Sequence, residues 1–274
     1  MTPSAYLREL ASAITRAEDV TDEEAQQVLF ELALRIYALL QSRLPATSFE
    51  RQLAWPQIRR ELLPLLVEAS DRIYVLLFSR LTPTEVAILR STVRFYGFGE
   101  RVLPPRRLAE VTARTEVLRT PLATLFTPAA TGVPPFAAQL LRLLERSVLA
   151  AILRGDATSD VAATVIGTRT RSGRTTGVAR KGTVANAWRE RTRAVVAAAL
   201  WGLVAPSQER VATAATAEGV TTTTWRWVAI LDPRTCPVCR PLDGVTAAHP
   251  RDFPSGPPPL HPLCRCVVIP TYTT

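Results

Sequence analysis

The amino-acid sequence predicts a mainly α-helical fold with a small β component, an α+β arrangement that ends in a cysteine- and histidine-rich segment. Apolar residues recur at intervals of three and four over most of the 274-residue chain, which is the period of amphipathic helices. The segment VTTTTWRWVAIL (220–231) is instead rich in β-branched and aromatic residues, which favour strands. All four cysteines and both histidines fall between residues 236 and 266.

Residues 1–134 are predicted to form a helical N-terminal domain. A capping-box spacing that opens at Thr21 predicts a helix start there. A second helix is expected over 56–80, kinked or divided by Pro64. A third is expected to begin at Thr82 and to stop at Gly97.

The proline-rich stretch from 103 to 135 predicts loops and irregular connections around one short helix near 107–119. A domain boundary is therefore expected at Pro134, and residues 135–274 are predicted to form a C-terminal helical and β module. Its expected elements are a helix over 135–155, a short capped helix over 156–168, a helix from 184 through 205, a helix capped by Ser207 that stops at Gly219, a strand over 220–231 and a partner strand over 266–274.

The chain is strongly basic, with a net charge of +9, and arginine supplies nearly all of the positive charge. Such a charge favours an anionic partner, although a bias toward arginine codons would produce the same composition. Residues 168–193 combine a Gly- and Thr-rich loop with the start of a helix, and a solvated face without a partner is the alternative to DNA binding there. The candidate nucleic-acid-binding residues are Arg169, Arg171, Arg174, Arg180, Lys181, Arg189, Arg191 and Arg193.

Neither a secretory signal nor a membrane span is predicted. The start MTPSAYLREL lacks a basic segment followed by an apolar one, and the most apolar windows are too short to cross a bilayer. The protein is therefore expected to be made in a cytoplasm, without a membrane partner.

The cysteine spacing predicts a structural zinc site. Cys236 and Cys239 form a Cys-x-x-Cys pair, and His261, Cys264 and Cys266 supply a second group from a distant loop. Five candidate ligands thus compete for the four places around a tetrahedral ion: Cys266 is either the spare or takes the place of His261. A site closed by four protein ligands favours a scaffolding role over catalysis, because it leaves no position for water.

Other interpretations of the cysteines are open. Disulfides are disfavoured in a reducing cytoplasm, and a thioredoxin-like redox pair would need a helix where Pro241 and Gly244 stand. Four unrelated buried thiols would not need to share one short segment. His249 is a weaker candidate ligand than His261.

The residues Trp227, Cys236, Cys239, His261, Cys264 and Cys266 stand in an order and spacing that resemble the C-terminal signature of the phage Mu F-protein-like head morphogenesis family. Upstream, ILRGDATSDVAATVIG is similar to the family's helix–Gly–helix lead-in, but Arg193 stands where members commonly carry a glutamate after Arg-Thr. The positions that match the signature are Trp227, Asp232, Arg234, Thr235, Cys236, Cys239, Leu242, Gly244, His261, Pro262, Cys264, Arg265 and Cys266.

The resemblance implies a minor head protein of a tailed bacteriophage, made in the host cytoplasm and carried inside the capsid near the portal. It implies portal, capsid and scaffold proteins as partners of the N-terminal helices, and a role in assembly without enzymatic activity. Packaged double-stranded DNA would be contacted by the basic residues without sequence preference.

Two further classes of function are considered. The chain could be a phage-encoded enzyme, a processing protease or transferase-type effector, with Cys236 and His261 as a nucleophilic pair. It could also be a sequence-specific zinc DNA-binding protein of the host, but the proline-broken segment after Cys239 offers no recognition helix.

Overall fold

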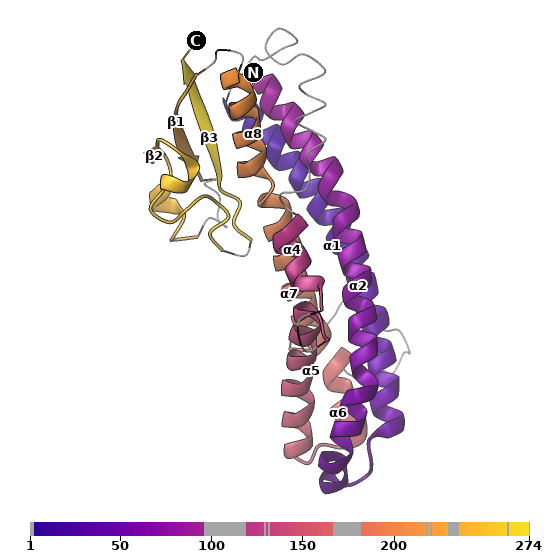
Figure 1. Cartoon of the computed structure of the whole chain (residues 1–274). Helices are drawn as coiled ribbons and strands as arrows, with labels where there is room; N and C mark the ends of the chain where they lie inside the picture. The colour runs from indigo at the N-terminus through magenta and orange to yellow at the C-terminus, as the bar shows by residue number, and fades with distance from the viewer. Residues whose placement is uncertain are drawn as a thin grey trace. The chain divides into compact units, whose positions relative to one another are not determined.

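The computed structural model describes residues 3–95, 119–128, 130, 132–166, 182–217, 219, 221–229, 236–261 and 263–273. It is mainly helical with one small antiparallel sheet, as the sequence predicts (Figure 1). The helices are α1 (Pro3–Arg43), α2 (Ser48–Phe95), α4 (Arg119–Phe126), α5 (Pro135–Leu153), α6 (Thr158–Ile166), α7 (Val184–Trp201) and α8 (Val204–Ala217), and the strands are β1 (Thr221–Val228), β2 (Thr246–Ala247) and β3 (Val267–Thr273).

The helix start predicted at Thr21 is wrong, because α1 already begins at Pro3. The Thr21 hydroxyl donates a hydrogen bond to the carbonyl oxygen of Ala17 at 2.7 Å, one turn back in the same helix. A threonine hydroxyl can bond either to a free N–H at a helix start or to the preceding turn, and here it does the second.

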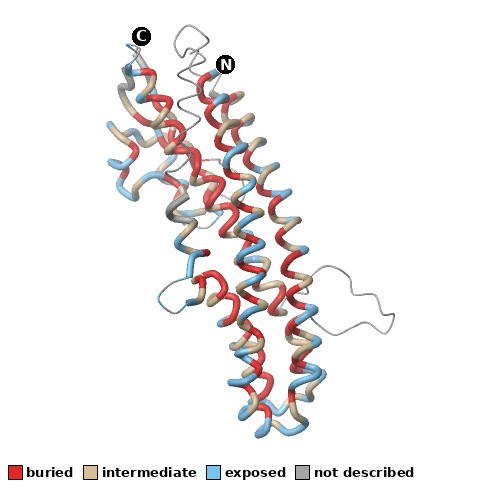
Figure 2. The backbone as a smooth tube through the Cα atoms, turned by 45° about the vertical axis from the view of Figure 1, so that its right-hand side comes forward, coloured by how far each residue is buried: buried red, intermediate tan, exposed pale blue. Residues whose placement is uncertain are grey.

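Helix α2 is continuous, so the division expected at Pro64 and the new start expected at Thr82 are both wrong. Pro64 and Pro83 both lie at exposed positions of α2. A proline inside a helix costs about 3 kcal/mol, and the long buried stripe on the opposite side of α2 outweighs this cost. That stripe includes Ile58, Leu62, Leu66, Ile73, Leu77, Leu81 and Ile88, and Figure 2 shows buried and exposed residues alternating along the long helices.

The proline-rich stretch before Pro135 contains helix α4, where loops were expected, and Phe126 of this helix is buried against Phe136 of α5, with ring centroids 4.9 Å apart. The stop predicted at Gly97 and the short helix predicted near 107–119 lie outside the described residues, apart from Arg119 itself.

The chain forms two compact units, each assembled from segments that are distant in sequence. Unit 1 comprises Met1–Thr21, Phe78–Arg119 and Ala194–Thr274, and unit 2 comprises Asp22–Leu77 and Thr120–Arg193. Each unit combines parts of both ranges that the sequence analysis separates at residue 134, and that division stays a prediction.

In unit 1, polar side chains join the N-terminal helices to α8 in a buried environment. The Tyr6 hydroxyl contacts the Thr92 hydroxyl at 2.9 Å and accepts a hydrogen bond from Gln208 Nε2 at 2.9 Å. Arg210 of α8 forms an ion pair with the buried Glu85 of α2. Buried hydrogen bonds of this kind require specific partners, so they fix which segments pack together.

In unit 2, α5 and α6 lie where the sequence predicts them. Helix α7 begins at Val184 as predicted but ends at Trp201, so the predicted continuation of this helix to residue 205 is wrong. Helix α5 begins at Pro135 and ends before Gly155, whose φ of 78° is the left-handed conformation that glycine adopts without strain. Trp188 of α7 is fully buried and donates its indole N–H to the Leu140 carbonyl oxygen at 2.9 Å. This bond satisfies the one polar group of a large buried side chain.

The sheet of unit 1 has the order β2-β1-β3, and both neighbours of β1 are antiparallel to it. The predicted strand pair is therefore confirmed. Trp227 lies opposite Val268, and Val228 lies opposite Val267. Helix α8 packs on this sheet through Ala205 and Ala212; it starts at Val204, so the cap predicted at Ser207 is wrong.

A membrane-crossing helix would need a long apolar stretch, and no helix within the described ranges has one.

Candidate metal centre

The pairing of β1 with β3 brings the two cysteine-containing segments to the same end of the sheet. Strand β1 ends at Val228, ahead of Cys236, and β3 begins at Val267, directly after Cys266. Because Val228 and Val267 are partners in an antiparallel pair, the chain leaves β1 next to where it enters β3.

The first cysteine pair lies in a tight turn. The carbonyl oxygen of Cys236 accepts hydrogen bonds from the N–H groups of Cys239 at 3.2 Å and Arg240 at 3.1 Å. The N–H of Cys239 also points at the Cys236 sulfur, at 3.3 Å. Backbone N–H groups directed at sulfur stabilise the thiolate form, which is the form that binds metal.

The second group also lies on a turn, in which the N–H of Cys264 donates to the His261 carbonyl oxygen at 3.0 Å. Leu263 in this turn has a φ of 65° and is the only described non-glycine residue with a positive φ. A leucine in this region costs about 1–2 kcal/mol relative to glycine.

The segment between the two turns is tied to β1. Gly244, with a φ of 81°, donates its N–H to the Trp227 carbonyl oxygen at 2.9 Å, and the Trp227 N–H donates to the Val245 carbonyl oxygen at 2.8 Å. The Asp243 carboxylate accepts the Ala229 N–H at 2.9 Å. These bonds fix the end of β1 from which the first cysteine turn departs.

The five predicted ligands form two overlapping groups among the described residues. Cys236, Cys239 and His261 make one, and Cys239, Cys264 and Cys266 make the other; within each group all ligand atoms lie within 4.8 Å of one another. The His261 Nε2 lies 2.9 Å from the Cys236 sulfur and 3.2 Å from the Cys239 sulfur. Cys239 therefore stands at the centre of the cluster.

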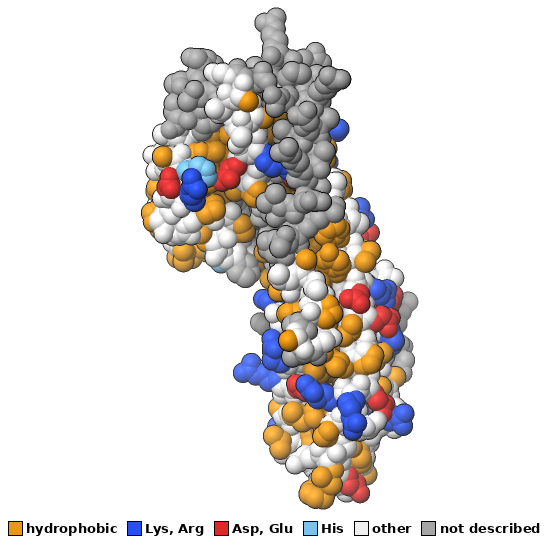
Figure 3. Space-filling model, viewed as in Figure 1, with side chains coloured by type: hydrophobic (Ala, Val, Ile, Leu, Met, Phe, Trp, Pro, Cys, Tyr) orange, Lys and Arg blue, Asp and Glu red, His pale blue; other side chains and the backbone are white. Residues whose placement is uncertain are grey.

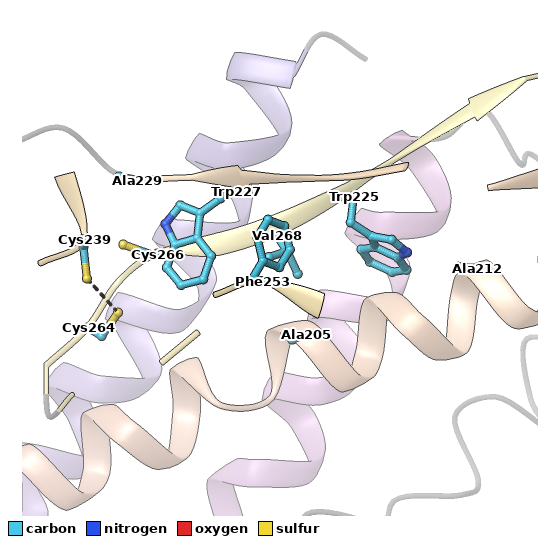
Figure 4. Packing of buried hydrophobic residues seen from close by; sticks show 10 residues of the cluster. All are labelled: Ala205, Ala212, Trp225, Trp227, Ala229, Cys239, Phe253, Cys264, Cys266 and Val268. Atoms are coloured by element: carbon cyan, nitrogen blue, oxygen red, sulfur yellow. Dashed lines mark hydrogen bonds between the residues drawn. The ribbon is translucent and has the colours of Figure 1, made fainter. Parts of the chain in front are cut away.

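The donor set fits a zinc ion. With zinc–sulfur bonds of about 2.3 Å, two sulfurs of a tetrahedral site lie about 3.8 Å apart. The sulfurs of Cys239 and Cys264 are 3.7 Å apart (Figure 4). Three buried thiols, one half-buried thiol and an imidazole are ligands typical of structural zinc rather than of magnesium or calcium.

The thiols perturb one another strongly. A hydrogen bond from the Cys266 thiol lowers the pKa of Cys264 to about 5, and the same bond, with burial, raises the pKa of Cys266 far above its usual range. Burial, reinforced by the neighbouring thiols, raises the pKa of Cys239 to about 12. Burial opposes ionisation of Cys236 as well, but hydrogen bonds from Cys239 and Val238 and the nearby His261 lower the pKa of its thiol.

These opposed shifts follow from placing several thiols in one buried site, where one negative charge discourages the next. A divalent cation removes the conflict, because thiols that coordinate zinc are deprotonated.

Residues 143–269 match the family model described as phage Mu protein F like protein. This segment is Mu F-like. The resemblance noted in the sequence is thereby confirmed, and the family is one of structural phage head morphogenesis proteins. No characterised protein and no solved structure matches the chain.

The Mu F-like segment contains all five candidate ligands, and the structure brings them together as the spacing predicts. Their role as metal ligands stays a prediction. His249 belongs to neither group; its ring Nδ1 accepts the Arg251 N–H at 3.4 Å and caps a short 3-10 helix over Pro250–Asp252. The signature positions Asp232, Arg234, Thr235 and Pro262 lie outside the described residues.

Sequence reasoning missed Asp243 and Phe253. Asp243 fastens the end of β1, and Phe253 packs edge-on against Trp227, with ring centroids 5.5 Å apart at 72°. The Leu-Asp-Gly triplet could have indicated the first of these, since aspartate before glycine is typical of turns that bond to backbone N–H groups. Phe253 carries no such local signal, because its packing depends on the tertiary fold.

The predicted DNA-binding residues are only partly described. Arg169, Arg171, Arg174, Arg180 and Lys181 lie outside the described residues. In α7, Arg189 and Arg193 are spaced four apart and share a helix face. Arg191 lies on another face and donates its Nε–H to Gln139 of α5 at 2.7 Å, so it serves packing within unit 2.

Replacing Cys239 by serine should lower zinc affinity more than replacing any other candidate ligand, because Cys239 alone belongs to both groups. Cys266→Ser and His261→Ala should lower zinc affinity to different extents, since only one of these two residues is expected to be the fourth ligand of the tetrahedral ion. Zinc competition against a chromophoric chelator, with metal per chain measured by elemental analysis, provides the ranking. His249→Ala is the matched control and should leave the affinity unchanged; a ranking in which Cys239→Ser is harmless would contradict the shared-ligand geometry.

Proposed function

We propose that the chain is a structural head protein of a tailed phage whose C-terminal module is held together by one zinc ion. The observation that carries the proposal is the convergence of Cys236, Cys239, His261, Cys264 and Cys266 within the Mu F-like segment. Four of these side chains would complete a closed tetrahedral site. Such a site stabilises a fold and leaves no open position for a reacting water.

The metal is needed because the segment it would hold has a small core of its own. Among residues 236–261, the buried ones are Cys239, Pro250, Phe253 and Pro258. A segment that buries so little apolar surface gains only a few kcal/mol from burial, whereas structural zinc contributes about 10–16 kcal/mol in small peptides. Zinc would therefore supply most of the free energy that orders this segment.

Removal of the metal by a chelator should release the C-terminal sheet and leave unit 2 folded. Hydrogen exchange should accelerate in β1 and β3, while the amides of α5 and α6 keep their protection, because those helices have their own buried stripe. Mass spectrometry of the exchanged protein, with and without chelator, measures both at once. Re-addition of zinc is the control for specificity, and unchanged exchange in β1 and β3 would contradict a structural role for the metal.

The proposed place of action is the interior of the phage head near the portal, with portal, capsid and scaffold proteins as partners. The family match supports a head protein, and the helical segments of residues 1–134 would supply the docking surfaces. The protein would be made in the host cytoplasm and incorporated during head assembly.

Mass spectrometry of purified virions tests this place directly. The protein should be found in complete particles and should remain with heads when tails are removed. Portal-proximal incorporation predicts crosslinks to the portal protein. Absence from heads that contain the portal and the major capsid protein in normal amounts would rule out the proposal.

Contact with packaged DNA is proposed for the Arg189–Arg193 face of α7, together with the basic residues before it in sequence. On the surface that Figure 3 shows, the described arginines are interspersed with acidic side chains. The high arginine density of residues 168–193 supports this segment as the principal basic site of the chain.

DNA affinity should fall steeply with salt and show no sequence preference, because arginine–phosphate contacts release counterions without reading bases. The double variant Arg189→Ala/Arg193→Ala should reduce the slope of log K against log salt by about 2, on the basis of about 0.9 per phosphate contact. Arg191→Ala is the control and should change stability rather than slope, since this side chain bonds to Gln139. Fluorescence anisotropy with two unrelated duplexes measures both quantities, and a salt-independent affinity would exclude phosphate binding.

A cysteine enzyme is the second candidate function, and the observation that favours it is the 2.9 Å contact between Cys236 and His261. A nucleophilic pair needs a free thiolate next to a base, whereas a zinc site occupies both groups. Alkylation of the zinc-loaded protein separates the two: a single fast-reacting Cys236 supports catalysis, and four protected thiols support the metal.

A further inference from the structure

Trp227 of β1 carries a buried polar group that the fold leaves unused. Its side chain is fully buried, and the indole Nε1 has no hydrogen-bond partner among the described residues. A buried donor without an acceptor is unfavourable, because it has lost its hydrogen bonds to water and gained none in the protein. The other fully buried tryptophans with a placed partner, Trp188 and Trp201, direct Nε1 to the Leu140 carbonyl oxygen and the Glu18 carboxylate.

The position of Trp227 in the sheet places this donor beside the cysteines. Trp227 is paired with Val268, and Cys266 lies two residues before Val268, so Trp227 and Cys266 are diagonal neighbours on one face. Both belong to the buried cluster that also contains Cys239 and Cys264. Figure 4 shows the nitrogen-bearing edge of the Trp227 ring turned toward Cys266.

We propose that the Trp227 indole N–H donates a hydrogen bond to the thiolate of Cys266 when the cluster holds a metal ion. The proposal rests on the zinc site proposed above and adds a positioning residue to it. It also assigns Cys266 to the ligand set, a choice that the spacing in the sequence leaves open.

The physical reason is the change in acceptor strength of sulfur. A neutral thiol is a weak acceptor, whereas a metal-bound thiolate carries negative charge that a nearby N–H stabilises. Residues that bond to metal ligands orient them and raise metal affinity. Backbone hydrogen bonds to Gly244 and Val245 fix the main chain of Trp227, and the ring of Phe253 packs edge-on against its indole ring.

The substitution Trp227→Phe removes the N–H and keeps an aromatic ring. Zinc affinity should fall by about ten- to a hundredfold, the usual effect of removing a partner of a metal ligand. Trp225→Phe is the matched control: Trp225 is buried in the same strand and cluster, and it is farther from Cys266 in the strand register. The zinc affinity of the Trp225→Phe variant should stay within about twofold of that of the unsubstituted protein, because Trp225 has no metal ligand to position.

A spectroscopic readout tests the bond in the unsubstituted chain first. In the full chain loaded with ¹¹³Cd in place of zinc, a correlation between cadmium and the Trp227 indole proton is expected, because coupling passes through an N–H···S–Cd bond. Cys266→Ser should abolish this correlation. A correlation that persists in Cys266→Ser would overturn the assignment to Cys266.

The outcomes separate the two proposals. If the unsubstituted chain binds neither zinc nor cadmium, the metal site itself is wrong. If it binds both with high affinity, yet gives no cadmium–indole correlation and Trp227→Phe binds zinc equally well, the metal site stands and the role of Trp227 is overturned.

Discussion

The antiparallel pairing of β1 with β3 is the constraint on which the candidate site depends. The two cysteine segments are separated by the long loop that contains β2, and neither has enough apolar residues to find the other by burial alone. The register that sets Trp227 opposite Val268 brings the end of one segment to the start of the other. A shift of one residue in this register would turn Trp227 to the other face of the sheet and separate it from Cys266.

Electrostatics then explains how a cation would stabilise such a cluster. Cys239, Cys264 and Cys266 are all buried, and ionisation of one raises the cost of ionising the next. Without a cation the cluster can hold only part of the negative charge that its donor set would carry. A single divalent ion converts this repulsion into attraction, so the same closeness that is unfavourable among free thiols becomes favourable among ligands.

The sequence predicts the grouping of the candidate ligands and the strand pair well, because both depend on local patterns: fixed Cys/His spacing, and β-branched runs on either side of it. It is less informative about helix ends. Thr21, Thr82 and Ser207 all have the local character of caps, yet each lies inside a longer helix, because packing along the whole element outweighs one terminal hydrogen bond. The packing of the Phe253 ring against Trp227 cannot be predicted from the sequence, since it depends on the path of the loop between these two residues.

Unit 1 connects the sheet that carries the Cys/His cluster to the N-terminal helices. Helix α8 contacts the sheet through Ala205 and Ala212, and it contacts α1 and α2 through Gln208 and Arg210. Loss of Arg210 from its ion pair with Glu85 would be costly, because the carboxylate of Glu85 is buried and would be left without its partner charge. Helix α8 therefore packs on one side against the sheet that the metal is proposed to order, and it bonds to α1 and α2 through its polar side chains. Loss of the metal would weaken the hold on α8 from one side only, and the polar contacts to Tyr6 and Glu85 would still retain the helix from the other.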